Sequence, residues 1–204
     1  MKTKKNSQHL LIVISAPSGC GKTTIINKLM ERNPGIERSV SATTRLPRTG
    51  EKSGSDYFFL SAKEFLKEKR SGTFVEWARI YGYYYGTFKR FISQKLNSGK
   101  DLVLAIDVEG ARQVRKKIKA VFIFIMPPSF KELQKRLVGR KSDPEEEIQR
   151  RLERARYEIS CAQEYDYIVT NRVVGRTVKA IEMIIKKEKQ PRSAKRAQKM
   201  ISVK

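Results

Sequence analysis

The residues best suited to chemistry in this sequence form a short loop, SAPSGCGKTT, at positions 15–24. Two glycines, Gly19 and Gly21, are followed directly by Lys22 and Thr23. Glycines let the backbone curl until several N–H groups point inward, and the next helix adds its positive end. Lys22 can then reach the β- and γ-phosphates of a nucleotide, and the Thr23 hydroxyl can bind Mg²⁺. The loop predicts a binding site for the phosphates of a nucleoside triphosphate, but it does not identify the molecule that accepts the transferred phosphate.

The surroundings of this loop support the same interpretation. It follows the apolar run 10–15, which favours a buried strand, and a helical pattern begins at about Lys22. A strand before the loop and a helix after it distinguish a phosphate loop from a chance glycine-rich turn. Cys20 is predicted to be a small buried side chain rather than a reactive thiol. The residues expected around the nucleotide phosphates are Ala16, Pro17, Ser18, Gly19, Cys20, Gly21, Lys22, Thr23 and Thr24.

Asp107 is the carboxylate that we expect nearest to the loop. It follows the apolar run 102–106, and parallel strands of one sheet finish at the same edge. We therefore expect Asp107 close to Thr23, where the two side chains would hold Mg²⁺, partly through water. The alternative is an ordinary turn residue, because aspartate is common in turns.

A second phosphate-binding element is predicted in the stretch SVSATTRLPRTGEKSGSDYFF, residues 39–59. Arg45 and Arg48 lie three residues apart around Pro47, which stiffens the turn. Two guanidinium groups held together suit a phosphate, since arginine binds such oxygens bidentately. Tyr57 can add a hydroxyl. The arginines alone leave open a solvated basic loop with no ligand.

The elements that must position these groups alternate between strands and helices. Such alternation indicates an α/β fold with a parallel sheet covered on both faces. The expected strands are 10–15, 102–106, 121–126 and 167–169, and the expected helices are one from about 22 to 33, 108–118, a pair within 129–163, and 174–187.

Two stretches interrupt this alternation. Residues 41–86 indicate short strands and turns around one helix, which the capping box Ser61–Glu64 begins. Residues 129–163 indicate a charged helical hairpin. Its first helix begins at Ser129 and its second at Asp143-Pro144, with proline placed where a first turn tolerates it.

Composition limits the classes of function. The 204 residues include one histidine and two cysteines, which excludes a His/Cys metal cluster and favours a reduced, cytoplasmic protein. The longest apolar run, 10–14, is too short for a membrane span. The net charge of +23 indicates polyanionic ligands such as nucleotides. Residues 186–204 hold eight Lys/Arg against one Glu, which we interpret as a solvated helix end rather than a nucleic-acid site.

The phosphate loop and the stretch 39–59, together with EWARIYGYYYGT at 76–87, AIDVEGA at 105–111 and EYDYIVTN at 164–171, resemble the guanylate kinase family. The resemblance runs in order from about residue 10 to about residue 187. It implies a phosphate-loop nucleoside monophosphate kinase fold that transfers the γ-phosphoryl group of ATP to GMP with Mg²⁺, in guanine nucleotide biosynthesis and recycling. Whether dGMP is also accepted stays open.

The resemblance also divides the single kinase domain, residues 1–204, into parts. A parallel-sheet core would comprise residues 9–40, 93–128 and 164–190. A GMP-binding subdomain would comprise residues 41–92, and a mobile lid residues 129–163. The basic C-terminal tail, 191–204, lies beyond these parts.

Site residues carried over from the family fall into three groups. Those expected to meet the guanine are Ser41, Glu76 and Thr87, with Asp107 close to both base and metal. Those expected to hold the GMP phosphate are Arg45, Arg48, Tyr57 and Tyr85. Those expected to supply positive charge are Lys22 and the lid arginines Arg140 and Arg151, with Arg136 as a weaker candidate. Asn171 is expected to lie beside the adenine of ATP.

Glu76 is the residue that we expect to select the base. Guanine presents an N1–H and an N2 amino group side by side, and one carboxylate can accept from both. Adenine has a lone pair at N1, and a site of this kind can reject the analogue lacking the donor by about 10⁴–10⁵. The alternative is a glutamate paired with Arg79. The nearby cluster Tyr81, Tyr83, Tyr84 and Tyr85 is interpreted mainly as packing under a loop.

Three positions depart from the family pattern. Ala105 stands where an acidic residue is common, Lys141 replaces a glycine after Arg140, and Arg172 replaces an aspartate after Asn171. They concern the predicted metal site, the lid tip and the adenine contacts. The alternative functions are a scaffold module without catalysis, which tends to lose the loop lysine that is present here, and an RNA-related kinase, for which no RNA-binding module is recognisable.

Overall fold

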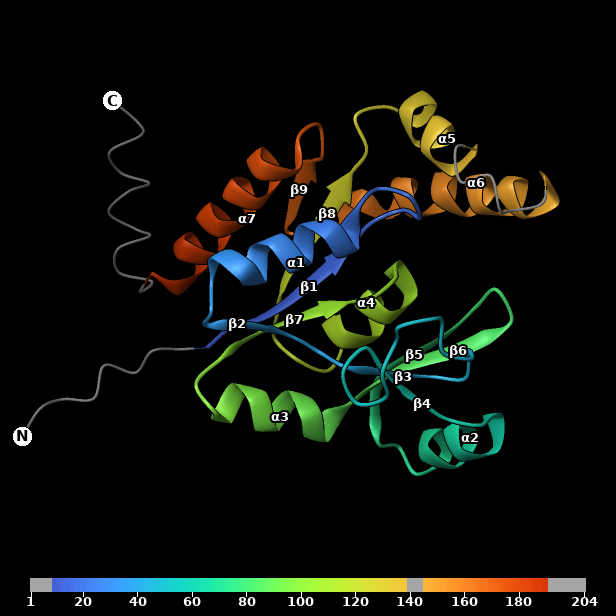
Figure 1. The fold of residues 1–204 in the computed structure, drawn as a ribbon. Coiled ribbons are helices and arrows are strands. Elements are labelled where there is room, and N and C mark those ends of the chain that lie inside the picture. Colours follow the sequence, from blue (N-terminus) through green and yellow to red (C-terminus); the bar gives the residue numbers. More distant parts are fainter. Residues whose placement is uncertain (1–8, 139–144, 191–204) are drawn as a thin grey trace, which may run out of the picture.

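The computed structural model describes residues 9–138 and 145–190 (Figure 1). Its centre is a parallel five-stranded sheet with the order β2-β7-β1-β8-β9. Each central strand is a continuous apolar run, which is typical of strands buried on both faces. The strands are β1 (Leu11–Ser15), β2 (Ile36–Arg38), β7 (Asp101–Ala105), β8 (Val121–Met126) and β9 (Tyr167–Thr170).

Helices cover both faces of this sheet. Side chains alternate along β1, so Ile12 and Ile14 join the core under α1 (Lys22–Arg32) and α7 (Val174–Lys189). Leu11 and Val13 face the other side, where α3 (Lys89–Asn97) and α4 (Val108–Arg115) pack. All residues of β1 are buried, so the loop that follows it is held on a rigid base.

The inserted residues form a second, four-stranded sheet with the order β4-β3-β6-β5. It has a small aromatic core of its own, built around Phe65, Phe74 and Phe88. The helix α2 carries the predicted capping box, because Ser61 accepts from the Glu64 N–H and Glu64 accepts from the Ser61 N–H. These elements are β3 (Ser41–Thr43), β4 (Tyr57–Phe59), α2 (Ala62–Arg70), β5 (Phe74–Ile80) and β6 (Tyr83–Phe88).

A helical hairpin stands over the carboxyl edge of the parallel sheet. It consists of α5 (Phe130–Val138) and α6 (Glu145–Ser160), followed by the short helix η1 (Cys161–Glu164). Leu133, Leu137, Leu152 and Ala155 are buried and join the core under α1 and α7. On α6, Ile148 and Ile159 also pack against this core, so the four α6 residues form one apolar face of the helix.

The sequence prediction is confirmed for the parallel sheet, the inserted sheet and the helical hairpin, with small shifts of boundary. The helix predicted at 108–118 ends at Arg115. Two elements were missed. The edge strand β2 has only three residues, and α3 alternates basic and apolar residues too briefly for a clear period.

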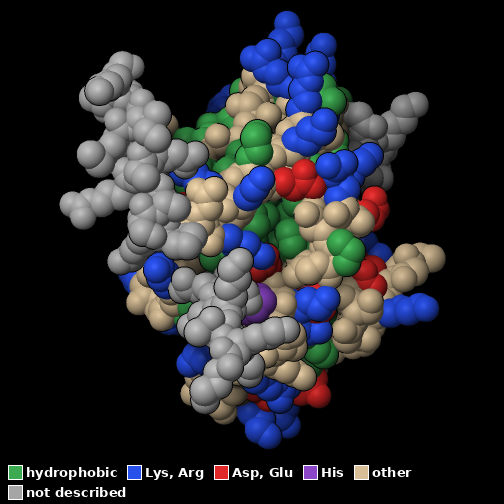
Figure 2. Space-filling model, turned by 90° about the vertical axis from the view of Figure 1, so that its left-hand side faces the viewer, with side chains coloured by type: hydrophobic (Ala, Val, Ile, Leu, Met, Phe, Trp, Pro, Cys, Tyr) green, Lys and Arg blue, Asp and Glu red, His purple; other side chains and the backbone are tan. Residues whose placement is uncertain are grey.

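Positive charge is spread over the face shown in Figure 2 rather than gathered at one place. Lys and Arg side chains lie at its upper end, at its lower end and between them, with several acidic side chains among them. Within the described residues, no helix is long and apolar enough to cross a bilayer.

Candidate functional site

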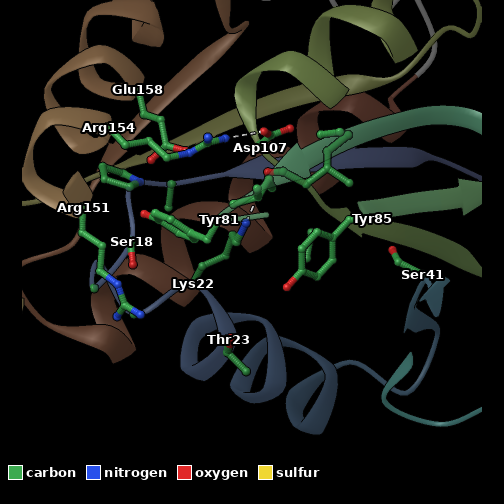
Figure 3. A pocket seen from close by; sticks show the side chains of 18 of the residues that line it. Ser18, Lys22, Thr23, Ser41, Tyr81, Tyr85, Asp107, Arg151, Arg154 and Glu158 are labelled. Atoms are coloured by element: carbon green, nitrogen blue, oxygen red, sulfur yellow. Dashed lines mark hydrogen bonds and ion pairs between the residues drawn. The ribbon is translucent and has the colours of Figure 1, made fainter. Parts of the chain in front are cut away.

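A cleft of about 390 Å³ lies between the phosphate loop, the β5–β6 hairpin, the carboxyl end of β7 and helix α6 (Figure 3). It brings together residues from all three parts of the fold. The residues that line it are Ala16, Pro17, Ser18, Gly19, Gly21, Lys22, Thr23, Thr24, Ser41, Arg48, Tyr57, Glu76, Ala78, Ile80, Tyr81, Tyr85, Ala105, Ile106, Asp107, Arg151, Arg154 and Glu158.

The phosphate loop curls through two glycines in the left-handed region. Gly19 has φ 82° and Gly21 has φ 86°, conformations that other residues rarely adopt. A Cβ on Gly19 would lie 3.0 Å from Leu137 of α5, so the helical hairpin packs directly on the loop. Cys20 is fully buried, and burial raises the pKa of its thiol to about 11, which confirms the packing role.

Lys22 opens α1 and reaches across the cleft floor. Its Nζ donates to the carbonyl oxygen of Ile106 at 3.2 Å. Burial lowers the pKa of Lys22, while the nearby carboxylates of Glu158 and Asp107 oppose the shift. The ammonium group is thus held in a poorly solvated place, where its charge acts strongly on any phosphate oxygen close by.

Glu76 of β5 also lines the cleft, and it is 3% exposed. The Thr87 hydroxyl donates to its Oε1 at 2.6 Å, and the Ser41 and Thr87 hydroxyls lie 3.3 Å apart. Burial raises the pKa of Glu76 to about 7, and the charge of Asp107 adds to the shift, although the Thr87 hydrogen bond opposes it. The alternative pairing with Arg79 is wrong, because Arg79 donates to the carbonyl oxygen of Gly82.

Asp107 joins helix α4 to helix α6 at the cleft. As the N-cap of α4 it accepts from the Gly110 N–H at 2.8 Å through Oδ1. Its Oδ2 accepts from Nη2 of Arg154 at 2.7 Å. Asp107 and Thr23 both line the cleft, as expected from the shared edge of the parallel strands.

Sequence reasoning missed Arg154, Glu158 and Tyr81. Arg154 donates to Glu158 as well as to Asp107, and Glu158 is 5% exposed. Burial raises the pKa of Glu158, while Arg154 and Lys22 oppose the shift. The signal was present in the sequence: positions 151, 154 and 158 lie three and four apart, which places them on one face of α6.

The basic loop 45–48 is stiffened by a residue that the sequence analysis passed over. Glu51 accepts two hydrogen bonds from Nη2 of Arg45, at 2.9 and 3.0 Å, and one from the Arg48 N–H at 2.8 Å. The Arg45 guanidinium also lies 5.4 Å from the centre of the Tyr57 ring. Arg48, Tyr57 and Tyr85 line the cleft together with Glu76, whereas Arg45 is not among the residues that line it.

The remaining predicted residues are spread more widely. Arg151 lines the cleft and pairs with Glu147 at 3.1 Å, whereas Arg136 pairs with Glu132 at 3.1 Å on α5. Arg140, together with Lys141, lies outside the described residues.

Asn171 is buried behind the phosphate loop. Its Nδ2 donates to the carbonyl oxygen of Cys20 at 2.8 Å, and its Oδ1 accepts from the Thr177 hydroxyl at 3.0 Å. Both ends of the amide are therefore engaged in anchoring the loop to α7. Contact with adenine stays a prediction for this residue.

The donor set suits a magnesium ion that arrives with a nucleotide. No group of three or more His, Cys, Asp or Glu side chains in the described residues could hold a metal by itself. Thr23 and Asp107 offer one hydroxyl and one carboxylate, and Ala105 offers none. Mg²⁺ commonly keeps several waters and binds through one or two protein groups plus substrate phosphates, so these residues fit it.

Comparison with known proteins gives a consistent result. The family model described as "Guanylate kinase" matches residues 8–188. The chain is 47% identical over 190 residues to a protein named guanylate kinase from Caldanaerobacter subterraneus subsp. tengcongensis, covering 93% of this chain and 91% of that protein. It is 43% identical over 180 residues to the guanylate kinase of Thermotoga maritima, covering 88% and 87%. A crystal structure of guanylate kinase from Anaplasma phagocytophilum aligns with a TM-score of 0.75 and 35% identity, covering 91% of this chain and 88% of that one.

Proposed function

The chain belongs to the guanylate kinase family, and we propose that its cleft binds ATP and GMP at opposite ends and transfers the γ-phosphoryl group between them. The activity is that of an ATP:GMP phosphotransferase. Phosphoryl transfer requires in-line placement of the two substrates and stabilisation of charge, and it needs no protein nucleophile. The roles below are assigned on that basis.

Glu76 selects the base in this proposal. In its ionised form the carboxylate accepts from N1–H and the N2 amino group of guanine, and Thr87 holds it in place through the 2.6 Å hydrogen bond. Ser41, 3.3 Å from the Thr87 hydroxyl, offers a further contact to the purine edge. The burial of Glu76 strengthens the selection, because an unpaired polar group is costly away from water.

Lys22 and the loop amides hold the β- and γ-phosphates of ATP. The strand and helix around the loop fix these donors in advance, so little reorganisation is needed when charge moves. On the acceptor side, Arg45, Arg48, Tyr57 and Tyr85 hold the phosphate of GMP. Glu51 fixes Arg45 and the Arg48 backbone, which keeps the two arginines in one arrangement.

Arginines of the helical hairpin stabilise the negative charge that develops on the phosphate oxygens during transfer. Arg151 already lines the cleft, and Arg140 is proposed to join it from the hairpin tip. When bound, Mg²⁺ would supply positive charge that offsets the negative charge of the phosphates; Thr23 and Asp107 are the residues proposed to hold it, partly through water. We also propose a cytoplasmic location, supported by the buried free thiols of Cys20 and Cys161.

The observation that carries these assignments is one cleft that joins a phosphate loop to a buried glutamate hydrogen-bonded by threonine. The test is the substitution Glu76→Gln, which keeps the size of the side chain but replaces one acceptor oxygen by a donor. GMP turnover, as kcat/KM, is expected to fall by at least about 10²-fold, because one guanine donor then faces an amide donor. ATP binding, measured by calorimetry, should be unchanged.

Lys22→Met provides the matched test at the other end. It removes the charge and keeps the length, so transfer should fall below detection while GMP still binds with the parent dissociation constant. Equal ratios of GMP to AMP activity in the parent and in Glu76→Gln would refute the role of Glu76. Normal turnover in Lys22→Met would refute the role of the loop.

A further inference from the structure

The tip of the β5–β6 hairpin carries an unusual residue. Ile80 pairs with Tyr83, so Tyr81 and Gly82 form a two-residue turn, and both have positive φ, 49° and 87°. Turns of this kind favour Asn-Gly, because asparagine and glycine adopt the left-handed region more readily than bulky residues. Tyr81 is the one non-glycine residue with positive φ in the described parts of the chain. The left-handed conformation is unfavourable for tyrosine, so we expect contacts of the Tyr81 ring to offset this cost.

The ring of Tyr81 contacts the helical hairpin. The guanidinium carbon of Arg151 lies 5.6 Å from the ring centre and that of Arg154 lies 5.8 Å from it. Both distances fall in the range of cation–π attraction. Figure 3 shows Tyr81 beside these two α6 residues at the mouth of the cleft, and Figure 1 shows the hairpin and α6 extending to the same side of the core.

The contact continues into the core of the molecule. Arg154 also donates to Asp107 at 2.7 Å and to Glu158 at 3.2 Å. One line of contacts thus joins the inserted sheet through Tyr81, the helical hairpin through Arg154 and the parallel sheet through Asp107. The two arginines leave α6 about one turn apart, so a single ring can orient both.

We propose that Tyr81 is a positioning residue: its ring links the GMP-binding hairpin to α6 and holds Arg151 in place for the transfer. This rests on the proposed function of Arg151. The arrangement couples the two substrate sites, because a movement of the β5–β6 hairpin on GMP binding also moves the surface against which Arg151 rests. Tyr81 does not itself touch the reacting atoms in this proposal.

The substitution Tyr81→Asn separates this role from a structural one. Asparagine suits the positive φ, so the midpoint of thermal unfolding should stay equal or rise. The ring contacts are lost, so kcat should fall about tenfold, which corresponds to about 1.4 kcal/mol, with the GMP dissociation constant within about twofold of the parent. Tyr81→Phe keeps the ring and should restore kcat to within about twofold of the parent.

Tyr83→Asn is the matched control, because Tyr83 lies in the same hairpin and is 45% exposed. It should leave kcat and the GMP dissociation constant as they are. A double variant Tyr81→Asn with Arg151→Gln should lose no more kcat than Arg151→Gln alone, as expected if Tyr81 acts through Arg151.

These results can be told apart from a failure of the proposed function. The proposed function fails if the parent protein does not transfer phosphate to GMP, or if Glu76→Gln keeps the parent ratio of GMP to AMP activity. The inference on Tyr81 is overturned if Tyr81→Asn keeps the parent kcat, if Tyr81→Phe falls as far as Tyr81→Asn, or if Tyr83→Asn falls equally. It is also overturned if the effects of Tyr81→Asn and Arg151→Gln add.

Discussion

At the scale of single residues, the proposed selection of guanine depends on the protonation state of Glu76. The carboxylate must be ionised to accept from both N–H groups of guanine, but burial raises its pKa to about 7 in the free protein. Near neutral pH the free protein is therefore a mixture of molecules with an ionised and with a protonated Glu76, and only the ionised form suits guanine. GMP binding to the protonated form requires that Glu76 releases its proton.

A pH dependence follows from this shift. Between pH 6 and pH 8, kcat/KM for GMP should rise toward a plateau with a midpoint near the pKa of about 7, since kcat/KM reports the free enzyme. Initial rates at fixed ATP and ionic strength measure it. The variant Glu76→Gln is the control, because it retains the titration of the GMP phosphate and should lose the step that belongs to the carboxyl group. An identical profile in parent and variant would contradict the assignment.

The sequence predicted several residues that line the cleft, but not their protonation states. The phosphate loop was predicted from its motif, Asp107 from its place after a strand, and Glu76 and Thr87 from the resemblance to a family. The pairings were not predictable: Arg154 meets Asp107 across 47 positions, and Glu51 fixes the arginines of its own loop. Such contacts depend on how helices and loops pack, which spacing alone does not determine.

At the scale of elements, helix α4 supports the base-recognising end of the cleft. Gly110 lies in its first turn, where a Cβ would stand 2.6 Å from Oε2 of Glu76 and 3.2 Å from Oδ1 of Asp107. The absence of a side chain thus lets the helix end approach the buried carboxylate closely. The Gly110 N–H also donates to Oδ1 of Asp107, whose side chain caps the helix.

Gly110→Ala tests this close approach. Alanine favours a helix by about 1 kcal/mol relative to glycine, so the backbone alone predicts a gain in stability. The Cβ must displace the Glu76 carboxylate, however, so KM for GMP is expected to rise at least about tenfold with little change in KM for ATP. Steady-state kinetics in both substrates measure this.

Gly175→Ala in α7 is the control, because no atom lies within 4 Å of the Cβ that it would gain. It should keep the parent kinetics and unfold at an equal or higher temperature. If Gly110→Ala also kept the parent KM for GMP, the geometry described for Glu76 would be wrong.

Element prediction succeeded where one physical signal dominated. Continuous apolar strands and capped helices with a clear apolar face were found close to their bounds. The strand β2 was missed because its pairing with β7 supplies the stability that three residues lack. The helix α3 was missed because it packs through few side chains, with Ile92 its one buried residue.

At the scale of the whole molecule, three parts of the fold meet around one cleft, and the proposed catalysis depends on all of them. The parallel sheet supplies Lys22 and Asp107, the inserted sheet supplies Glu76, and the helical hairpin supplies Arg151. The order of these parts along the chain was predicted from the resemblance to a family. The network between them was visible only once the parts were packed.

The basic C-terminal residues are expected to lie outside this machinery. The family match ends at residue 188, and Lys189, which pairs with Asp101, is the last residue with a contact that ties α7 to the sheet in the described part of the chain. Removing residues 191–204 should therefore leave kcat and both KM values within about twofold of the parent. Steady-state assays at low and high salt measure this; a collapse in activity at both would assign the segment a role in the fold or the site.

The most direct test of the proposed function is to measure which nucleoside monophosphate accepts the phosphoryl group. Purified protein with ATP and Mg²⁺ is given GMP, AMP, CMP or UMP in turn, and ADP release and the nucleoside diphosphate formed are measured together. We expect one GDP per ADP with GMP, and kcat/KM for AMP lower by at least about 10³-fold, since Glu76 accepts from donors that adenine lacks. No GDP from GMP, or equal rates with GMP and AMP, would contradict it.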